Sequence, residues 1–289
     1  MKHLLVVADD FGYGIARDQG LVKCFQAGAV SALSLLAHCK HSNDAVNLAK
    51  NHNIPVGLHF NLTEGLPLAP RHTVASLIGK DGKFLGKQQF WANENIEPKH
   101  VKVELKAQIK WFENNFGRPP FRIDGHQHVH VHGNVSEVFS RTLSECGIKS
   151  TRLPVEHTAS RSSCETSPQR ELFHSLIENC ALKTKLTFAE HCVQHTEAFL
   201  GLNFMGNAMD TDRLQTVIKS VFDSGVSSCE LMCHPGFICD KSEDGFVGNT
   251  SADIFSCSPD REHELKILTS PEMLQFYQDE DISLCAKSA

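Results

Sequence analysis

The sequence predicts an α/β protein built as an irregular (β/α) barrel with parallel strands. Short apolar segments alternate with amphipathic segments along the whole chain, which is typical of parallel strands covered by helices. Roughly seven or eight such units fit into 289 residues, which favours a barrel over an open doubly wound sheet. The first strand is not followed by a GxGxxG motif, which counts against a dinucleotide-binding fold. We therefore expect one domain that spans residues 1–289.

The first half of the chain contains the expected elements in regular alternation. Apolar runs without polar alternation predict strands buried on both faces, at residues 3–8, 30–37 and 55–60. Helices are expected between them, over residues 16–27 and 43–51. Residues 62–90 are rich in Gly and Pro and predict a long loop.

The clearest helix is expected over residues 98–116. Its apolar side chains recur at spacings of four, four, three and four, at Val101, Leu105, Ile109, Phe112 and Phe116. Pro98 is tolerated in the first turn of a helix, and Gly117 is suited to end one.

The second half repeats the alternation around one polar insertion, expected over residues 156–169. Strands are predicted at residues 121–124, 148–152, 228–233 and 282–285. Helices are predicted over residues 135–146, 172–182 and 211–223, with a last helix before the final strand.

Composition and charge exclude several classes of protein. The net charge of -6 leaves no basic footprint for nucleic acid. The first apolar run is too short for a secretion signal, and no stretch reaches the roughly 20 residues of a membrane span. Eleven scattered cysteines without a CxxC pair predict free thiols in a reducing cytoplasm, although Cys229 and Cys233 could instead join a metal site. We expect a cytoplasmic protein without nucleic-acid or membrane partners, and its oligomeric state, a homo-oligomer included, stays open.

Polar side chains stand where the expected strands end. They are Asp9 and Asp10, His59, Asp124, His126 and His128, Arg152, and His234. The carboxyl ends of parallel strands lie on the same side of a barrel, and ligands bind there. We therefore expect these residues to meet at one mouth, with His128 and Arg152 in contact with substrate.

The adjacent pair Asp9 and Asp10 indicates a cation site. Two neighbouring carboxylates repel each other, and a bound metal relieves that repulsion while leaving the second carboxylate free to act as a base. The alternative is that the pair caps the following helix. Adjacent residues of a regular strand face opposite ways, so both can reach one site only if the backbone bends near Gly12 and Gly14.

The segment 124–132 holds four alternating histidines, His126, His128, His130 and His132. In an extended segment all four share one face, and in a helix His126 lies near His130. Either geometry can bind a divalent cation, whereas the alternative is a polar loop that is merely rich in histidine.

Two further histidines are candidates. His59 is a metal ligand or a hydrogen-bonded core residue, and a Pro-Gly turn after His234 presents an imidazole that can act as general acid. Four other histidines, His38, His41, His52 and His100, are expected at the surface.

Together these pieces resemble the YdjC-like carbohydrate deacetylases, which include the bacterial chitooligosaccharide deacetylases. The matching segments, in order, are Ala8-Asp9-Asp10-Phe11-Gly12, Gly57-Leu58-His59, Leu62-Thr63-Glu64-Gly65, residues 124–130, His234-Pro235-Gly236 and a tail over residues 261–271. The resemblance covers nearly the whole chain. At Gln127 the chain differs from several bacterial relatives, which carry His there, and this leaves the shape of the substrate pocket open.

The resemblance implies an irregular barrel and removal of acetyl groups from N-acetylglucosamine-type oligosaccharides. It implies one divalent metal held by Asp10, His59 and His126, with Asp9 as proton acceptor; His234 is the expected acid. Zn²⁺ suits these ligands by chemical type, while the resemblance implies Mg²⁺. The alternatives are another barrel metal hydrolase, of the amidohydrolase or PHP type, and a non-catalytic module that binds sugar or metal.

Overall fold

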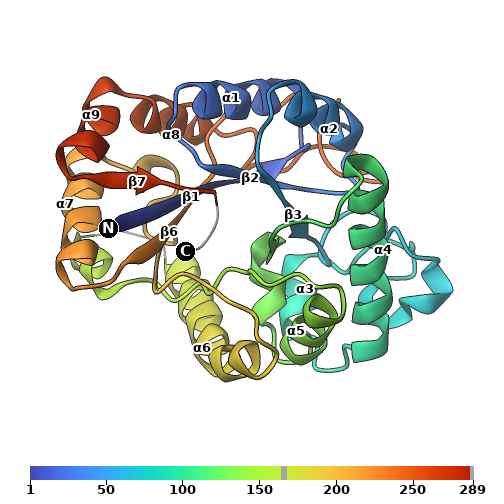
Figure 1. Cartoon of the computed structure of the whole chain (residues 1–289). Coiled ribbons are helices and arrows are strands. Elements are labelled where there is room, and N and C mark those ends of the chain that lie inside the picture. The colour runs from blue at the N-terminus through green and yellow to red at the C-terminus, as the bar shows by residue number, and fades with distance from the viewer. Residues whose placement is uncertain (164–167, 287–289) are drawn as a thin grey trace.

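The computed structural model describes residues 1–163 and 168–286, in which parallel strands curve around an interior and helices pack outside them (Figure 1). The strands are β1 (Lys2–Phe11), β2 (Ala32–Leu35), β3 (Val56–Phe60), β4 (Ile123–Gly125), β5 (Ala198–Leu200), β6 (Ser228–Cys233) and β7 (Ile282–Leu284). They form one sheet in the order β4-β3-β2-β1-β6-β5, with β7 paired to β1. The expected α/β fold with a parallel, irregular barrel is confirmed.

The helices that cover the sheet are α1 (Ile15–Gln26), α2 (Ser42–Asn51), α3 (Lys87–Ala92), α4 (Pro98–Phe116), α5 (Ser136–Glu145), α6 (Pro168–Glu190), α7 (Thr211–Asp223), α8 (Asp260–Leu268) and α9 (Pro271–Asp279). Within the described ranges, none of these helices is long and apolar enough to span a membrane.

The predicted bounds of α4, α7 and β6 are confirmed, and other bounds differ for physical reasons. The expected strand over residues 148–152 is wrong, because Ser150 makes only an isolated bridge to Gln194. β5 has three residues, too few for a sequence pattern. The expected insertion over residues 156–169 forms a 3-10 segment at Thr158–Ser163 and the start of α6, and its residues 164–167 lie outside the described ranges. Residues 62–90 contain two 3-10 turns and the start of α3.

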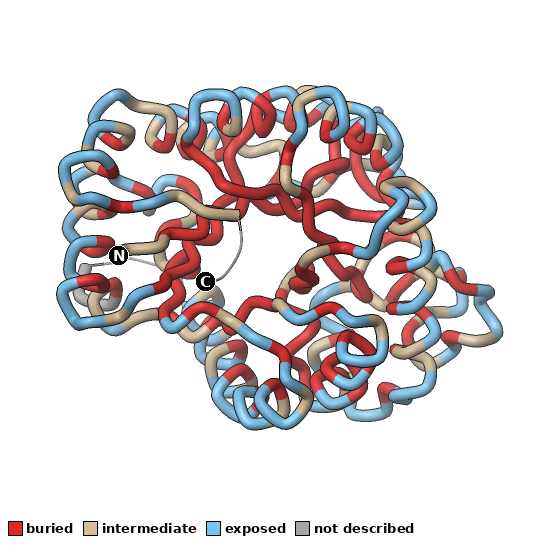
Figure 2. The backbone as a smooth tube through the Cα atoms, viewed as in Figure 1, coloured by how far each residue is buried: buried red, intermediate tan, exposed pale blue. Residues whose placement is uncertain are grey.

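The core lies between the strands and the inner faces of the helices. β1 is buried from Leu4 to Phe11, and the buried strands form the centre of Figure 2. Cys229 and Cys233 are buried free thiols on β6, and the Sγ of Cys233 donates to the carbonyl of Val7. Their position in the strand favours a packing role over the alternative of metal ligation.

Buried polar groups of α4 fix the loop that follows β3. The Glu104 carboxylate accepts hydrogen bonds from the backbone N–H groups of Leu68 and Ala69. Gln108 accepts from the N–H of Asn61 and donates to its carbonyl. Because these bonds replace water for buried backbone groups, they hold the loop in one conformation above the ends of the strands.

A close approach of two glycines connects α1 to the turn after β6. A Cβ at Gly20 would lie 2.6 Å from the Cα of Gly236 and 2.7 Å from the nitrogen of Phe237. Both atoms belong to the backbone, so neither can rotate away. The turn that carries His234 therefore depends on the absence of a side chain at Gly20.

We expect Gly20→Ala to destabilise the protein. The clash costs roughly 1–3 kcal/mol, which exceeds the gain of up to about 1 kcal/mol from replacing Gly by Ala in a helix. Urea unfolding should show the loss, whereas Gly133→Ala, where an added Cβ meets nothing within 4 Å, serves as the matched control. An unchanged midpoint for Gly20→Ala would contradict the packing argument.

Candidate metal centre and active-site pocket

A cavity of about 670 Å³ opens at the carboxyl ends of the strands. Six of the residues predicted from the sequence line it: Asp9, Asp10, His59, His126, His128 and His234. The cavity is thus placed where parallel α/β folds bind their ligands. The predicted convergence of these side chains on one mouth is what the structure shows.

A bend in β1 brings both aspartates to this cavity. The pairing of β1 with β2 shifts register between Ala8 and Phe11, and Asp10 has a positive φ of 63°. Left-handed backbone is uncommon for residues other than Gly, although Asn and Asp adopt it more often than most, and such conformations cluster at functional sites. The expected bend is therefore present, but it occurs at Asp10 itself, with Gly12 following at φ 92°.

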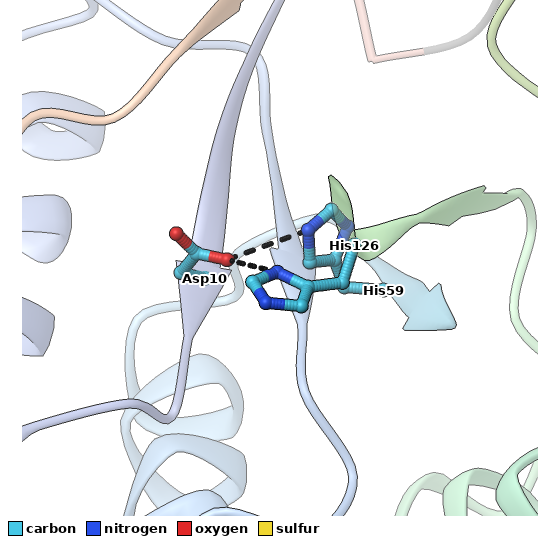
Figure 3. A group of neighbouring side chains, drawn as sticks. All are labelled: Asp10, His59 and His126. Atoms are coloured by element: carbon cyan, nitrogen blue, oxygen red, sulfur yellow. Dashed lines mark hydrogen bonds and ion pairs between the residues drawn. The ribbon is translucent and has the colours of Figure 1, made fainter. Parts of the chain in front are cut away.

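Asp10, His59 and His126 form a compact buried group (Figure 3). The Asp10 Oδ1 lies 3.0 Å from the Nδ1 of His126 and 3.4 Å from the Nε2 of His59. The three donor atoms lie within 4.8 Å of one another. One carboxylate oxygen and two imidazole nitrogens at this spacing suit a divalent cation, so the donor set fits the expected metal.

Each side chain of the group is held from behind by a second charged residue. The Nδ1 of His59 donates to Asp124 at 2.7 Å, and the Nε2 of His126 donates to Glu64 at 2.8 Å. The other oxygen of Asp10 accepts from Arg17 at 3.1 Å. Carboxylates that accept from the outer nitrogen of a histidine are the usual support of metal-binding imidazoles, because they fix the ring and its tautomer.

The carboxylates in and around this group stabilise positive charge on it. Burial alone lowers the pKa of an imidazole, but the carboxylates around His59, chiefly Asp9, raise its pKa to about 9. Asp10 and Glu64 likewise overcome burial and raise the pKa of His126 to about 10. In the absence of a cation the group therefore binds protons, and a metal would have to displace them.

A second group among the described residues, Asp9, His59 and Asp124, has comparable spacing but different surroundings. Arg152 donates to both oxygens of Asp9, at 2.6 and 2.8 Å. Arg152 and Arg122 also lie 3.4 Å from Asp124. The guanidinium groups already supply the positive charge here, so the group around Asp10 is the better cation site.

Arg152 does not lie where the sequence suggested. Its side chain is fully buried behind Asp9 and also donates to Glu230 at 2.7 Å. It does not line the cavity, because its donors face the carboxylates of the barrel interior. Contact between Arg152 and substrate is therefore unfavourable in this arrangement, and its geometry suits a positioning role.

The segment of four histidines adopts neither of the expected geometries. Residues His126–Val131 form an irregular 3-10 segment with left-handed backbone at Gln127 and His128. His126 and His128 consequently face the cavity, while His130 is buried below it and donates to the carbonyl of Arg152. His132 packs against Trp91 at a ring distance of 5.2 Å. Only part of the segment thus belongs to the site.

His128 and His234 are neutral imidazoles in this structure. Burial, the largest cause, holds the pKa of each well below its usual value. Neither Nδ1 atom has a hydrogen-bond partner among the described residues. The Nε2 of His234 lies 3.9 Å from Asp9, and its ring meets Phe255 edge-on at 5.1 Å. Both imidazoles line the cavity, where they can contact a bound molecule.

Sequence reasoning missed the role of the loop after β3. Asn61 accepts from the backbone N–H groups of Thr63 and Glu64, and this turn presents the Glu64 carboxylate to His126. The expectation of an exposed His38 is wrong, because its ring is buried 2.5 Å from Asn61. The motif around Glu64 was visible in the sequence, but only the fold shows which histidine it reaches.

Other lining residues also lay outside the prediction. They include Lys87, Phe173, His174, Phe255 and Arg261. Phe173 and Phe255 offer apolar ring faces against which a ligand such as a sugar ring can pack. No periodic pattern marks these positions, because they come from separate helices and loops.

Comparisons with known proteins agree with the site. A family model described as YdjC-like protein matches residues 3–279. The carbohydrate deacetylase of Danio rerio is 37% identical, with 98% of this chain and 96% of the relative covered. The Homo sapiens carbohydrate deacetylase is 38% identical, with 98% and 89% covered. The chitooligosaccharide deacetylase of Yersinia enterocolitica is 30% identical, with 95% and 93% covered.

A solved structure shares the fold. It is that of an Enterococcus faecalis V583 protein proposed to act in cellobiose-phosphate cleavage, with a TM-score of 0.78 and 25% identity over 98% of this chain and 97% of that one. The chain belongs to the YdjC-like family, as its sequence resemblance indicated.

We expect Arg152→Met to destabilise the protein strongly near neutral pH. Loss of this guanidinium leaves the buried Asp9 without its guanidinium partner, and Arg122 remains to pair with both Asp124 and Glu230, which costs on the order of 3–5 kcal/mol. Urea unfolding of the variant and the parent protein measures the loss. Arg141→Met, which removes an exposed pair with Glu137, is the matched control and should cost less than about 1 kcal/mol.

The pH dependence distinguishes this cause from a simple packing defect. Burial would raise the pKa of Asp124, but Arg152 with His59 and Arg122 holds it well below the usual value. Without Arg152 the buried carboxylates bind protons more readily than in the unfolded chain. The difference between variant and parent should therefore shrink as the pH falls from 7 towards 4. A difference independent of pH would contradict the electrostatic explanation.

Proposed function

We propose that this member of the YdjC-like family is a metal-dependent carbohydrate deacetylase. The reaction is hydrolysis of an N-acetyl group on an N-acetylglucosamine-type oligosaccharide to acetate and an amino sugar. The main support is that Asp9 lies beside the Asp10–His59–His126 group inside one cavity. The names of the deacetylase relatives support the same reaction.

Asp10, His59 and His126 would hold the cation. A divalent cation bound there supplies positive charge that lowers the pKa of water and polarises the acetyl carbonyl. Imidazole nitrogens suit Zn²⁺ by ligand type, while the family resemblance implies Mg²⁺, so the proposal includes one divalent cation of either kind. Glu64 and Asp124 keep the two imidazoles in place and orient their ligand nitrogens.

Asp9 would serve as the base. Arg152 fixes its carboxylate through both oxygens, and Oδ2 also lies 3.9 Å from the Nε2 atoms of His59 and His234. Burial raises the pKa of Asp9 against the opposing effect of Arg152 and His59, which favours proton acceptance. Asp9 thus accepts the proton of the water that attacks the acetyl carbon, and Arg152 acts through Asp9 as a positioning residue.

His234 would return a proton to the leaving nitrogen when the carbon–nitrogen bond breaks. Its pKa is held low by burial, so it must first acquire the proton that it gives away. Asp9 is the nearest source, at 3.9 Å from the Nε2 of His234. His128 lines the same cavity and is assigned to substrate contact.

A binding module without catalysis would have no need of Asp9. Its carboxylate lies beside the cation group but is fixed by Arg152 rather than by the metal ligands, as a base requires.

We further propose that residues 1–289 form one deacetylase domain, because a single sheet links the first and last described strands. The buried free cysteines support the proposed location in a reducing cytoplasm.

We expect the purified protein to release acetate from N-acetylglucosamine oligomers when Mg²⁺ or Zn²⁺ is added. A chelator should abolish the release, because the group of three ligands would lose its cation. Acetate measured enzymatically, beside a parallel assay on a phosphoester, checks the reaction. Phosphoester cleavage without acetate release would favour the other class of barrel hydrolase.

Asp9→Asn should lower kcat about 10²–10⁴-fold, because the amide cannot accept the proton of water. Metal affinity, measured by calorimetry, should change little, since Asp9 is not one of the three ligands. Asp10→Asn is the contrasting variant and should weaken metal binding, because Asp10 is one of the three ligands. Undiminished turnover by Asp9→Asn would remove the base from the mechanism, and melting temperatures show whether both variants remain folded.

Glu64→Gln should weaken metal binding about 10–100-fold. The neutral amide no longer supports the Nε2 proton of His126 as a carboxylate does. Zn²⁺ titration by calorimetry measures the change. Asp253→Asn, which removes another carboxylate of the same cavity that bonds to Tyr13, is the matched control. Equal losses of Zn²⁺ affinity in both variants would indicate a general effect of negative charge in the cavity rather than support of His126.

A further inference from the structure

The tail over residues 261–271 has no role in the reaction proposed above, yet it contacts the turn that carries His234. Its first part belongs to α8, which lies beside α1 (Figure 1). Arg261 and Glu264 are about one helical turn apart on α8, and both side chains are fully buried. Buried charges are costly unless they are paired, so their partners show what this part of α8 does.

The Glu264 carboxylate accepts hydrogen bonds from three places in the chain. Its Oε2 accepts from the backbone N–H of His234 at 2.6 Å. Its Oε1 accepts from the backbone N–H of Gly206 at 2.7 Å and from the Arg261 guanidinium at 2.9 Å. Gly206 follows Met205, which lines the cavity as His234 does. One buried carboxylate thus joins two segments of the cavity lining to α8.

The turn after β6 needs this support, because the sheet no longer pairs its backbone. The pairing of β6 with β1 ends one residue before His234. The residue after His234 is a proline and has no N–H. The next N–H, that of Gly236, donates to the carbonyl of Arg261 at 3.0 Å. α8 therefore satisfies both backbone donors of the turn, one through the Glu264 side chain and one through its own backbone.

The ring of His234 is not fixed by hydrogen bonds of its own. Its Nδ1 has no partner among the described residues, and its Nε2 lies 3.9 Å from Asp9, which is longer than a hydrogen bond. The ring packs edge-on against Phe255. In a Ser-His-Asp triad a carboxylate orients the histidine through its second ring nitrogen. Here a carboxylate holds the backbone of the histidine instead, so the place of the ring depends on Glu264.

We propose that Glu264 is a positioning residue, which fixes the turn of His234 and thereby holds the imidazole where it can protonate the leaving nitrogen. The task of the imidazole rests on the function proposed above, whereas the anchoring of its backbone does not.

Glutamine at position 264 isolates the contribution of the carboxylate. It has nearly the same shape as Glu264, but one acceptor oxygen becomes an N–H donor. Because the three hydrogen-bond partners of Glu264 are donors, one N–H then faces another whichever way the amide is turned. The turn of His234 should shift in response, and a displacement of about 1 Å at a reacting group costs on the order of 10²-fold in rate.

Two leaving groups distinguish positioning from a general loss of structure. E264Q should lower acetate release from N-acetylglucosamine oligomers about 10–100-fold, because the departing amine needs a proton. Hydrolysis of 4-nitrophenyl acetate should fall less than about two-fold, because nitrophenolate leaves without one. H234Q should show the same selective loss. The ratio of the two rates, measured on one preparation, does not depend on the fraction of protein that is folded.

E262Q is the matched control, because it removes an exposed carboxylate from the same helix, and it should change neither rate. Labelling of the histidines with ¹⁵N gives a second readout that needs no turnover. The backbone amide resonance of His234, assigned by its absence in H234Q, should move in E264Q and stay in place in E262Q. Equal losses on both substrates in E264Q, or an unmoved His234 resonance, would overturn the proposal.

E264D keeps the charge on a shorter side chain and replaces E264Q if that variant does not fold; it should show a smaller loss of the same selective kind. Unfolding of both variants would mean that Glu264 serves stability alone and would also overturn the proposal. A parent chain that releases no acetate, or full activity of H234Q on the oligomers, would instead contradict the function proposed above. The His234 resonance then decides the anchoring by itself.

Discussion

The buried ion network beneath the cavity is the constraint on which the site depends. Arg122 and Arg152 both bind Glu230, and Arg152 continues to Asp9. Carboxylates buried at the ends of parallel strands would otherwise repel one another and take up protons. The two guanidinium groups offset most of this negative charge, whereas the carboxylates at the Asp10–His59–His126 group face imidazoles, whose own pKa values rise in response. The network therefore fixes the proposed base, Asp9, and keeps it apart from the group that would hold the cation.

The bend in β1 directs Asp9 and Asp10 into two different surroundings. Asp9 and Asp10 are neighbours in the chain, yet one is held by Arg152 and the other faces two imidazoles. A regular strand would direct them to opposite faces, and the left-handed backbone at Asp10 prevents this. Local strain is tolerated because both carboxylates gain charged hydrogen bonds from their surroundings. The adjacent pair thus acquires two distinct environments within one cavity.

The sequence predicted the parts of the molecule that rest on periodic patterns. α4 and α7 were predictable because one face of each is buried at helical spacing, and polar residues at strand ends indicated the site. The four-histidine segment was not, because left-handed backbone at Gln127 and His128 has no periodic signature. Burial of Arg152 and of His38 depends on contacts with residues more than 20 positions away, which local patterns do not report. α6 was underestimated in length because exposed leucines stand between its buried residues and obscure the helical period.

The two histidines beside Asp10 present different ring atoms to it. His59 offers its Nε2, at the far end of the ring, whereas His126 offers the nearer Nδ1. A side-chain amide that imitates an Nε2 must be long, and one that imitates an Nδ1 must be short. Glutamine is consequently the isosteric replacement at His59, and asparagine is the corresponding replacement at His126. Two positions with the same residue type therefore follow different rules of substitution, and any redesign of this centre has to treat them separately.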